Sequence, residues 1–453
     1  MFPNLLEKAK TGSWSLNPKT NASSIFFYLL ILFLPTQLGK HFWPDFSYVY
    51  GLRIDYLSPT FYFTDILIIL LLASWFAENL RSIRHKTINK STIVKLFPFS
   101  VIVLFLLLGV FLSKNSLSGW YGFLKLLEFT GLGLYAAKNF RKANATVLFS
   151  CFILGVVFES LLAFFQYINQ GSLGGIFYFL GERAFNGQTP GVANASINGQ
   201  LILRPYATFS HPNVLAAYLL VFMLLIIYYS KKMFFKFQNF FLLLTLTIGS
   251  AGLFLSMGRV AIVFWIFSLG VILFRRVYKK NIYTFFWTNR IFSFIFLTVI
   301  VSLFFFPVGM RFLDFNLADQ TVVQRETLIQ DSLVMFWQNP VFGTGLNNFL
   351  ANLPKVQNQL HQEIYLQPVH NIFLLVLTET GIAGLLLSIY FFFITYKRIE
   401  KNKNTELYLL FFAIIFLGMF DHYFLTLQQG QIMLSLLLGL FWGLGQKDKE
   451  LLK

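Results

Sequence analysis

The chain has 453 residues, of which 56% are hydrophobic and only 12% are charged, and phenylalanine alone occurs 58 times. Soluble domains carry roughly 25% charged residues, because their surface must stay polar. The composition therefore excludes a soluble globular enzyme, a disordered chain and a nucleic-acid-binding module, and it predicts a polytopic membrane protein. The formal net charge of +17 is then interpreted by its position along the chain and not as a nucleic-acid footprint.

A helix needs about 20 apolar residues to cross the hydrocarbon core of a bilayer. The hydropathy pattern predicts an all-α fold, a single transmembrane domain spanning 1–453 with about twelve transmembrane helices. The predicted spans lie near residues 24–39, 61–78, 96–112, 120–137, 145–168, 209–229, 239–256, 259–274, 291–306, 371–395, 407–421 and 428–445.

The connecting loops alternate in charge. Twenty-six of the 36 lysines and arginines lie in one set of loops, which includes both chain termini, and nine lie in the other set. The positive-inside rule makes the first set cytoplasmic, so both termini are predicted to face inward. These cytoplasmic cations are explained by topology and by attraction to anionic membrane lipids.

Two of the predicted outer loops are long, at 169–208 and 307–370. The second lies between the ninth and tenth spans, and loops of that length usually carry function or helices of their own. Residues 321–338 have helix-like spacing of apolar positions. We therefore expect 307–370 to be a helical loop on the outer face.

Three arginines on the predicted outer side are candidate binding residues: Arg204, Arg259 and Arg325. Outward positive charge works against the topology rule, so it needs another reason. A guanidinium presents a planar fork of donors that fits phosphate oxygens and stays charged. As a set, the three suit a lipid-linked diphosphate, whereas each one alone is also explained as a snorkelling or loop-capping side chain.

Five of the six histidines lie on the predicted outer side. His370, followed by Asn371, stands where the large loop enters the tenth span, and an imidazole there is a natural candidate for a general base. His211, followed by Pro212 and Asn213, opens the sixth span. Proline and a polar neighbour in a first turn indicate a helix start, so a structural role is favoured for His211.

The acidic residues Glu128, Glu159 and Glu379 fall inside predicted spans, where an unpaired charge is costly. Lys125 lies one turn from Glu128 on the same helix face, and the two are expected to pair. Glu379 follows His370 by about two and a half helical turns and is a candidate to pair with an arginine and hold it in place. Glu128 and Glu379 are accordingly predicted to be structural and not catalytic.

Common cofactor motifs are missing from the sequence. It contains no HExxH, CxxC or clustered Asp/His pattern with metal spacing and no GxxxxGK[ST] loop. No metal site, no cofactor and no ATPase activity are therefore expected.

Several short elements carry a family resemblance. They are residues 204–213 (RPYATFSHPN), residues 339–345 (NPVFGTG), His370-Asn371 and residues 379–384 (ETGIAG). In this order they resemble the patterns R-x-x-G/A-T-F-x-H-P-N, N-P-x-x-G-x-G, H-N and E-x-G-x-x-G of the bacterial O-antigen ligase/polymerase superfamily. That family also tends to have Ser-Arg at the outer end of a helix hairpin, whereas here Gly258 precedes Arg259 and the serine is Ser256.

The resemblance implies a membrane glycosyltransferase of the bacterial plasma (inner) membrane, with its active site facing outward. Such enzymes take a glycan from undecaprenyl diphosphate and pass it to an acceptor hydroxyl during lipopolysaccharide or other polysaccharide biosynthesis. They work without a metal and invert the anomeric centre. By the same resemblance, Arg204, Arg259 and Arg325 would hold the diphosphate and His370 would activate the acceptor hydroxyl. The supporting residues would be His211, Asn213, Asn371 and Glu379.

Two other function classes stay open at this point. A transporter or flippase of a lipid-linked glycan would share the lipid and the arginines, but it should place acidic residues or broken helices near the membrane midplane. A non-catalytic scaffold would leave the ordered Arg and His elements unexplained. Within the transferase hypothesis, the sequence does not distinguish a ligase from a polymerase or a protein O-glycosylation enzyme.

Overall fold

The computed structural model describes residues 21–84, 90–197, 199–231, 238–278, 320–360 and 364–444. Within these ranges the chain is mostly helical, with a few short strands, which agrees with the predicted all-α class. The ninth predicted span, 291–306, lies outside the described residues, as does the start of the large loop.

The main helices are α2 (Ala22–Phe33), α3 (Phe63–Arg84), α4 (Lys90–Leu112), α5 (Ser116–Asn139), α6 (Ala145–Asn169), α8 (Pro212–Ser230), α9 (Gln238–Leu255), α10 (Arg259–Tyr278), α13 (Gln320–Gln338), α14 (Phe349–Leu360), α15 (Ile372–Glu400), α16 (Thr405–Gly418) and α18 (Gln428–Gly443). The shorter helical pieces are η1 (Asp45–Ser47), η2 (Asp55–Leu57), α7 (Ile176–Phe179) and α17 (Tyr423–Thr426). Among the described residues, six strands form three antiparallel ribbons: β1 (Gly39–His41) with β4 (Thr60–Tyr62), β2 (Tyr48–Val49) with β3 (Leu52–Arg53), and β5 (Asn194–Ile197) with β6 (Gln200–Leu203).

Among the described residues, four helices contain stretches long and apolar enough to cross a membrane. They are Phe63–Leu80 of α3, α6, α8 and α15. Four shorter apolar stretches coincide with further predicted spans, at Ala22–Phe33, Ser100–Leu112, Asn239–Leu255 and Thr405–Gly418. These helices agree with a membrane protein, while the number of spans and the inward orientation of the termini stay predictions.

Asparagine side chains define where several helices begin. Asn115, Asn144 and Asn404 precede α5, α6 and α16, and each side-chain oxygen accepts hydrogen bonds from backbone N–H groups of the first turn. These bonds satisfy donors that a helix leaves unpaired at its N-terminus. At α8 the side chain of His211 accepts from the backbone N–H of Asn213, and Pro212 lies in the first turn. This confirms the predicted helix start.

Helix α8 is the centre of the core. Nearly all of its side chains are buried, because α6, α9, α10 and α16 pack around it. A helix that is apolar on every face is either a membrane span or a core helix, and these contacts place α8 in the core. The first turn of α8 therefore delivers its polar side chains to the middle of one end of the bundle.

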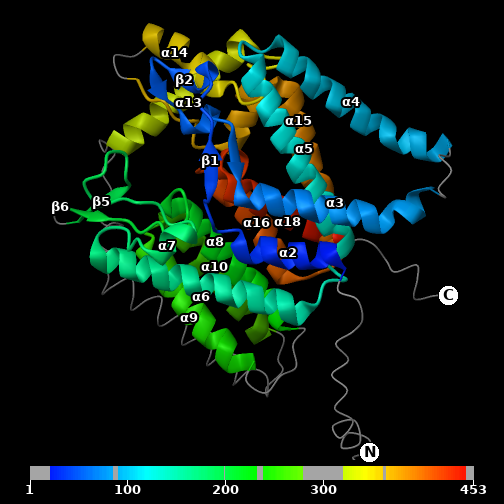
Figure 1. Cartoon of the computed structure of the whole chain (residues 1–453), viewed down its shortest axis with the longest axis vertical. Helices are drawn as coiled ribbons and strands as arrows, with labels where there is room; N and C mark the ends of the chain where they lie inside the picture. Colours follow the sequence, from blue (N-terminus) through cyan, green and yellow to red (C-terminus); the bar gives the residue numbers. More distant parts are fainter. Residues whose placement is uncertain are drawn as a thin grey trace, which may run out of the picture.

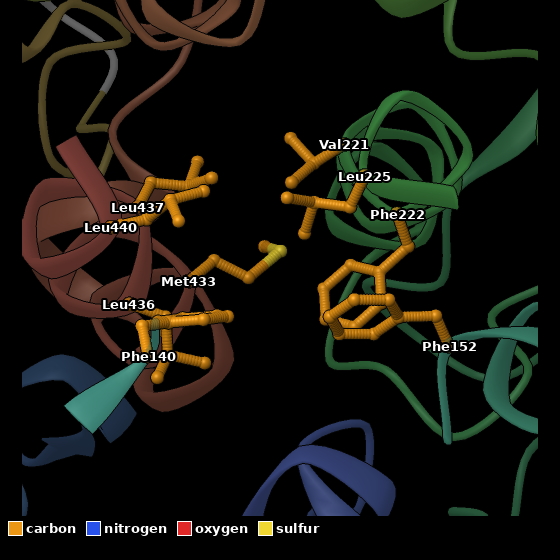
Figure 2. A pocket seen from close by; sticks show the side chains of 9 residues that line it. All are labelled: Phe140, Phe152, Val221, Phe222, Leu225, Met433, Leu436, Leu437 and Leu440. Carbon is orange, nitrogen blue, oxygen red and sulfur yellow. The ribbon is translucent and has the colours of Figure 1, made fainter. Parts of the chain in front are cut away.

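A gap in the apolar packing lies between α8 and α18. Figure 2 shows Met433 of α18 reaching toward Val221 and Leu225 of α8, with Phe152 of α6 and Phe140 below them. Every side chain that lines this cavity is apolar. It offers no group for binding or proton transfer, so we regard it as a packing defect and not as a site.

Helices α13 and α14 form a cap at one end of the bundle. Figure 1 places them at the top of the molecule with β2, and α13 packs against both α14 and α15. The helix expected over residues 321–338 is confirmed as α13. This end of the bundle corresponds to the face predicted to lie outward.

A buried ionic cluster joins α3, α5 and α18. Lys125 of α5 lies 2.7 Å from the Asp65 carboxylate of α3 and 3.1 Å from Glu128, and its Nζ donates to Oε1 of Gln428 at 3.3 Å. The expected pairing of Lys125 with Glu128 is thus confirmed. Asp65 and Gln428 are additional partners from distant parts of the chain.

We expect Lys125→Met to destabilise the protein by about 3–5 kcal/mol, because it leaves two carboxylates without their buried cation. Lys397→Met provides the control, since Lys397 and Glu400 form an exposed pair, which is worth at most about 1 kcal/mol. The measurement is unfolding of the purified variants in detergent. Equal losses for the two variants would contradict the structural role of the cluster.

Candidate functional site

Arg204 is held by two hydrogen bonds that fix its guanidinium at the start of α8. Its Nε donates to the backbone oxygen of Ser256 at 3.1 Å, and one terminal nitrogen donates to Oδ1 of Asn213 at 2.7 Å. The residue is only 6% exposed. A buried cation with so few solvent contacts is normally paired with a protein or ligand anion.

The three arginines singled out in the sequence line one pocket. The pocket has an empty volume of about 500 Å³, which includes the solvent-filled space at its opening. Its wall contains Arg204, Arg259 and Arg325. Asn213 and Asp421 add polar atoms. The remaining walls are mostly apolar, from Ala216, Met257, Gly258, Val260, Ala261, Leu417, Phe420 and Tyr423. Three segments spread over more than 100 residues of the chain therefore each contribute an arginine to one pocket.

A tight turn places Arg259 at the pocket as the first residue of α10. A Cβ atom at position 258 would lie 2.6 Å from Cβ of Ala216 on α8, so only glycine fits there. Ser256 contributes its carbonyl to Arg204, and its hydroxyl accepts from the N–H of Gly258 at 3.2 Å. The departure from the family's Ser-Arg pattern thus has a local packing reason.

His370 and His422 form a pair beside the pocket. Their ring centroids are 5.1 Å apart at an angle of 65°. Asp421 lies with them, since one potential ligand atom from each of the three residues falls within 4.8 Å of the others. Nδ1 of His370 is buried and makes no hydrogen bond in the described part of the chain. This nitrogen is therefore an unsatisfied buried polar atom at the site.

Asp421 joins the histidine pair to the arginine pocket. Its Oδ2 accepts from the side-chain amide of Asn213 at 2.8 Å, and its Oδ1 accepts from the backbone N–H of His422 at 2.8 Å. Burial alone would raise the pKa of Asp421, but the neighbouring histidines and the Asn213 amide lower it to about 2. Asp421 is consequently a carboxylate at neutral pH.

The histidines of the site are neutral at neutral pH. Burial lowers the pKa of His370 more than the Asp421 charge raises it, and burial likewise lowers the pKa of His422 to about 4. The positive charge of Arg325 also lowers the pKa of both histidines. A neutral imidazole has a free nitrogen lone pair, which is the form that accepts a proton.

His370, Asp421 and His422 also form a donor set typical of divalent metals. The sequence predicts no metal here, and the surrounding charges argue in the same direction. Both carboxylate oxygens of Asp421 already accept hydrogen bonds. Arg325 is close enough to disfavour positive charge on either imidazole, and it would disfavour a metal cation for the same reason.

Two of the supporting residues orient the helices that carry the site. Nδ1 of His211 accepts from the N–H of Asn213 at 3.1 Å, and burial lowers the pKa of His211 to about 3. The side chain of Asn371 accepts from the first-turn N–H groups of α15 and donates to the backbone oxygen of Met419 at 3.1 Å. Asn371 thereby holds the His370 turn against the end of α16.

The expected pairing of Glu379 with an arginine is wrong. Its carboxylate accepts from the backbone N–H groups of Asn347 at 3.1 Å and Phe349 at 3.2 Å. The cause is a break in α15 at Gly381, whose φ is 67°. A Cβ atom there would lie 2.2 Å from the carbonyl oxygen of Val341, so the NPVFGTG turn crosses the helix at that point. The residues that follow the turn then present their N–H groups to Glu379.

Sequence reasoning missed Asp421 and the site contacts of Tyr56 and His422. Asp421 closes the eleventh predicted span, and its only sequence signal is an Asp-His pair in the short loop before the last span. Tyr56 follows from no motif at all. Its ring packs edge-on against His422, with centroids 5.4 Å apart.

A comparison with protein families supports the resemblance noted in the sequence. Residues 240–389, about a third of the chain, match a family model described as O-antigen ligase, and no curated protein matches the chain. The matched range contains Arg259, Arg325 and His370, whereas Arg204 and Asp421 lie outside it. A match to that family agrees with the expected membrane glycosyltransferase-like enzyme. The match over residues 240–389 supports the resemblance to the O-antigen ligase/polymerase superfamily.

Proposed function

We propose that the protein transfers a glycan from undecaprenyl diphosphate to an acceptor hydroxyl on the outer face of the bacterial plasma membrane. The observation that supports this most is the single pocket lined by Arg204, Arg259 and Arg325, with a His370–Asp421 pair beside it. Guanidinium groups suit a diphosphate, and an imidazole next to them suits a hydroxyl. The pocket thus matches both halves of the reaction.

The arginines are assigned to the donor. As the bond between the anomeric carbon and the diphosphate breaks, negative charge grows on the leaving oxygens. Fixed guanidinium groups stabilise that charge without reorganisation, and in many enzymes such electrostatic stabilisation accounts for most of the rate enhancement. Three such charges do the work that a divalent metal does elsewhere, so the proposed reaction needs no metal.

His370 is assigned to the acceptor. Its neutral imidazole takes the proton of the acceptor hydroxyl while the oxygen attacks the anomeric carbon from the face opposite the diphosphate. One C–O bond forms, the C–O bond to the diphosphate breaks, and the anomeric configuration inverts. Asp421 then stabilises the imidazolium, because it is a carboxylate within reach of the ring.

The first prediction concerns the base. His370→Ala should lower the rate of glycan transfer by about 10²–10⁴-fold with little change in donor binding, because only proton transfer is lost. The measurement is turnover of purified protein in detergent with a lipid-linked donor and an acceptor. Wild-type protein that binds the donor but never transfers the glycan would favour the transporter alternative. Normal transfer by the variant would remove His370 from catalysis.

The second prediction concerns the fork of Arg204. Arg204→Lys should lower kcat/KM for the donor by about 10²–10³-fold, because the single lysine nitrogen does not reproduce the two guanidinium nitrogens that bond Asn213 and the backbone of Ser256. Arg183→Lys, at an exposed arginine outside the pocket wall, is the matched control. Similar kinetics for the two variants would argue against a specific role of Arg204.

The third prediction concerns pH. The rate should fall at acid pH as His370 becomes protonated, and Asp421→Asn should shift this fall to lower pH. The sign follows because the Asp421 charge raises the pKa of His370, so its removal lowers that pKa. The variant should also be slower, since its imidazolium is less stable. Asp45→Asn, an exposed residue of η1, is the control, and an unshifted profile in Asp421→Asn would contradict the pairing.

A further inference from the structure

Residues 204–208 form the segment that carries Arg204 into the pocket. This segment is anchored by α6, a helix with no residue in the pocket wall. Two α6 side chains, Glu159 and Gln166, reach its backbone. They are seven residues apart, which places them two turns apart on one helix face. Glu159 is 2% exposed and Gln166 is fully buried.

Gln166 uses its whole hydrogen-bonding capacity. Its Oε1 accepts from the backbone N–H groups of Tyr206 at 3.0 Å and Ala207 at 2.7 Å, and its Nε2 donates to the Ala207 carbonyl at 3.0 Å and to Glu182 at 2.8 Å. An amide offers two donors and two acceptor positions. No other side chain of this size and shape can make these four bonds.

Glu159 holds the next residue of the segment. Its carboxylate accepts from the backbone N–H of Thr208 at 3.1 Å and lies 3.0 Å from the Thr208 hydroxyl oxygen. That hydroxyl also lies 3.0 Å from the carbonyl oxygen of Pro35, which follows the end of α2. The backbone from 206 to 208 is therefore bonded at each residue to α6.

The backbone at the centre of this clamp is strained. Ala207 has φ of 51°, in the left-handed region that residues with a Cβ rarely adopt. Both its N–H and its carbonyl are bonded to Gln166. Three of the four bonds of Gln166 thus maintain a turn that the free chain would relax, and the turn sets the direction in which the chain leaves Arg204.

The same amide connects the turn to the loop after α6. Glu182, which receives one N–H of Gln166, also accepts from the backbone N–H groups of Leu173 and Gly174 at 2.8 and 2.7 Å. On the opposite side, the backbone N–H of Arg204 donates to the carbonyl oxygen of Ala193 at 3.1 Å. The N–H of Ala193 in turn donates to the Tyr206 hydroxyl at 2.7 Å. The segment is consequently held from both sides.

We propose that Gln166 and Glu159 are positioning residues for the donor site: they hold residues 206–208 so that the Arg204 guanidinium faces the diphosphate. The proposal rests on the function proposed above for Arg204. It assigns a role in catalysis to residues that touch neither substrate nor pocket. A misplacement of about 1 Å at a binding group is enough to cost about 10²-fold in rate.

Gln166→Glu is the sharpest test, because it keeps the shape of the side chain but removes both N–H donors. We expect kcat/KM for the lipid-linked donor to fall by about 10²-fold, mainly through the donor KM, while the acceptor KM stays unchanged. Thr208→Val, which removes only the hydroxyl facing Glu159, should act in the same direction if Gln166→Glu fails to fold. Thr208→Ser keeps the hydroxyl and should retain the wild-type donor KM.

Thr395→Val separates positioning from stability. Thr395 is fully buried on α15 and accepts from the Trp442 indole at 3.0 Å, far from the pocket. This control should lower the unfolding temperature in detergent without raising the donor KM. If Gln166→Glu and Thr208→Val change the donor KM no more than Thr395→Val, the positioning role is overturned. Wild-type protein without any transfer would instead overturn the proposed function, so the two failures are distinguishable.

Discussion

The site depends on the two hydrogen bonds of the Asn213 side-chain amide. Its oxygen accepts from the Arg204 guanidinium and its nitrogen donates to the Asp421 carboxylate. A side-chain amide offers an acceptor oxygen to a cation and a donor nitrogen to an anion at the same time. Asn213 therefore links the Arg204 guanidinium to the Asp421 carboxylate through one amide.

The position of Asn213 is in turn a consequence of the core. It lies in the first turn of α8, the helix that is buried on every side, and His211 and Pro212 define where that turn begins. Apolar contacts alone discriminate poorly among helix arrangements in a membrane, because lipid tails are as apolar as the side chains. Buried polar networks are more selective, since an unsatisfied group there is costly. The Lys125 cluster and the Gln166 amide show the same logic at two other places.

Prediction from the sequence succeeded where the signal is local. Helix α13, the cap formed by His211 and the Lys125–Glu128 pair all follow from spacing within a few residues of the chain. It failed where partners are distant. Glu379 bonds a turn some 30 residues away, and Asp421 meets His370 only because the ends of α15 and α16 are tied together through Asn371 and Met419. Nothing near either carboxylate in the chain indicates such partners.

The sequence by itself determined that this is an apolar, helical membrane protein, and its motifs named the arginines and the histidine of the candidate site. Both conclusions rest on composition and on short ordered elements, which need no knowledge of contacts. Only the tertiary structure decided that Arg204, Arg259 and Arg325 line one pocket, that Asp421 stands beside His370, and that α6 holds the arginine segment. The reason is physical: hydrogen bonds between buried polar groups act over about 3 Å in space, whatever the separation of the residues along the chain.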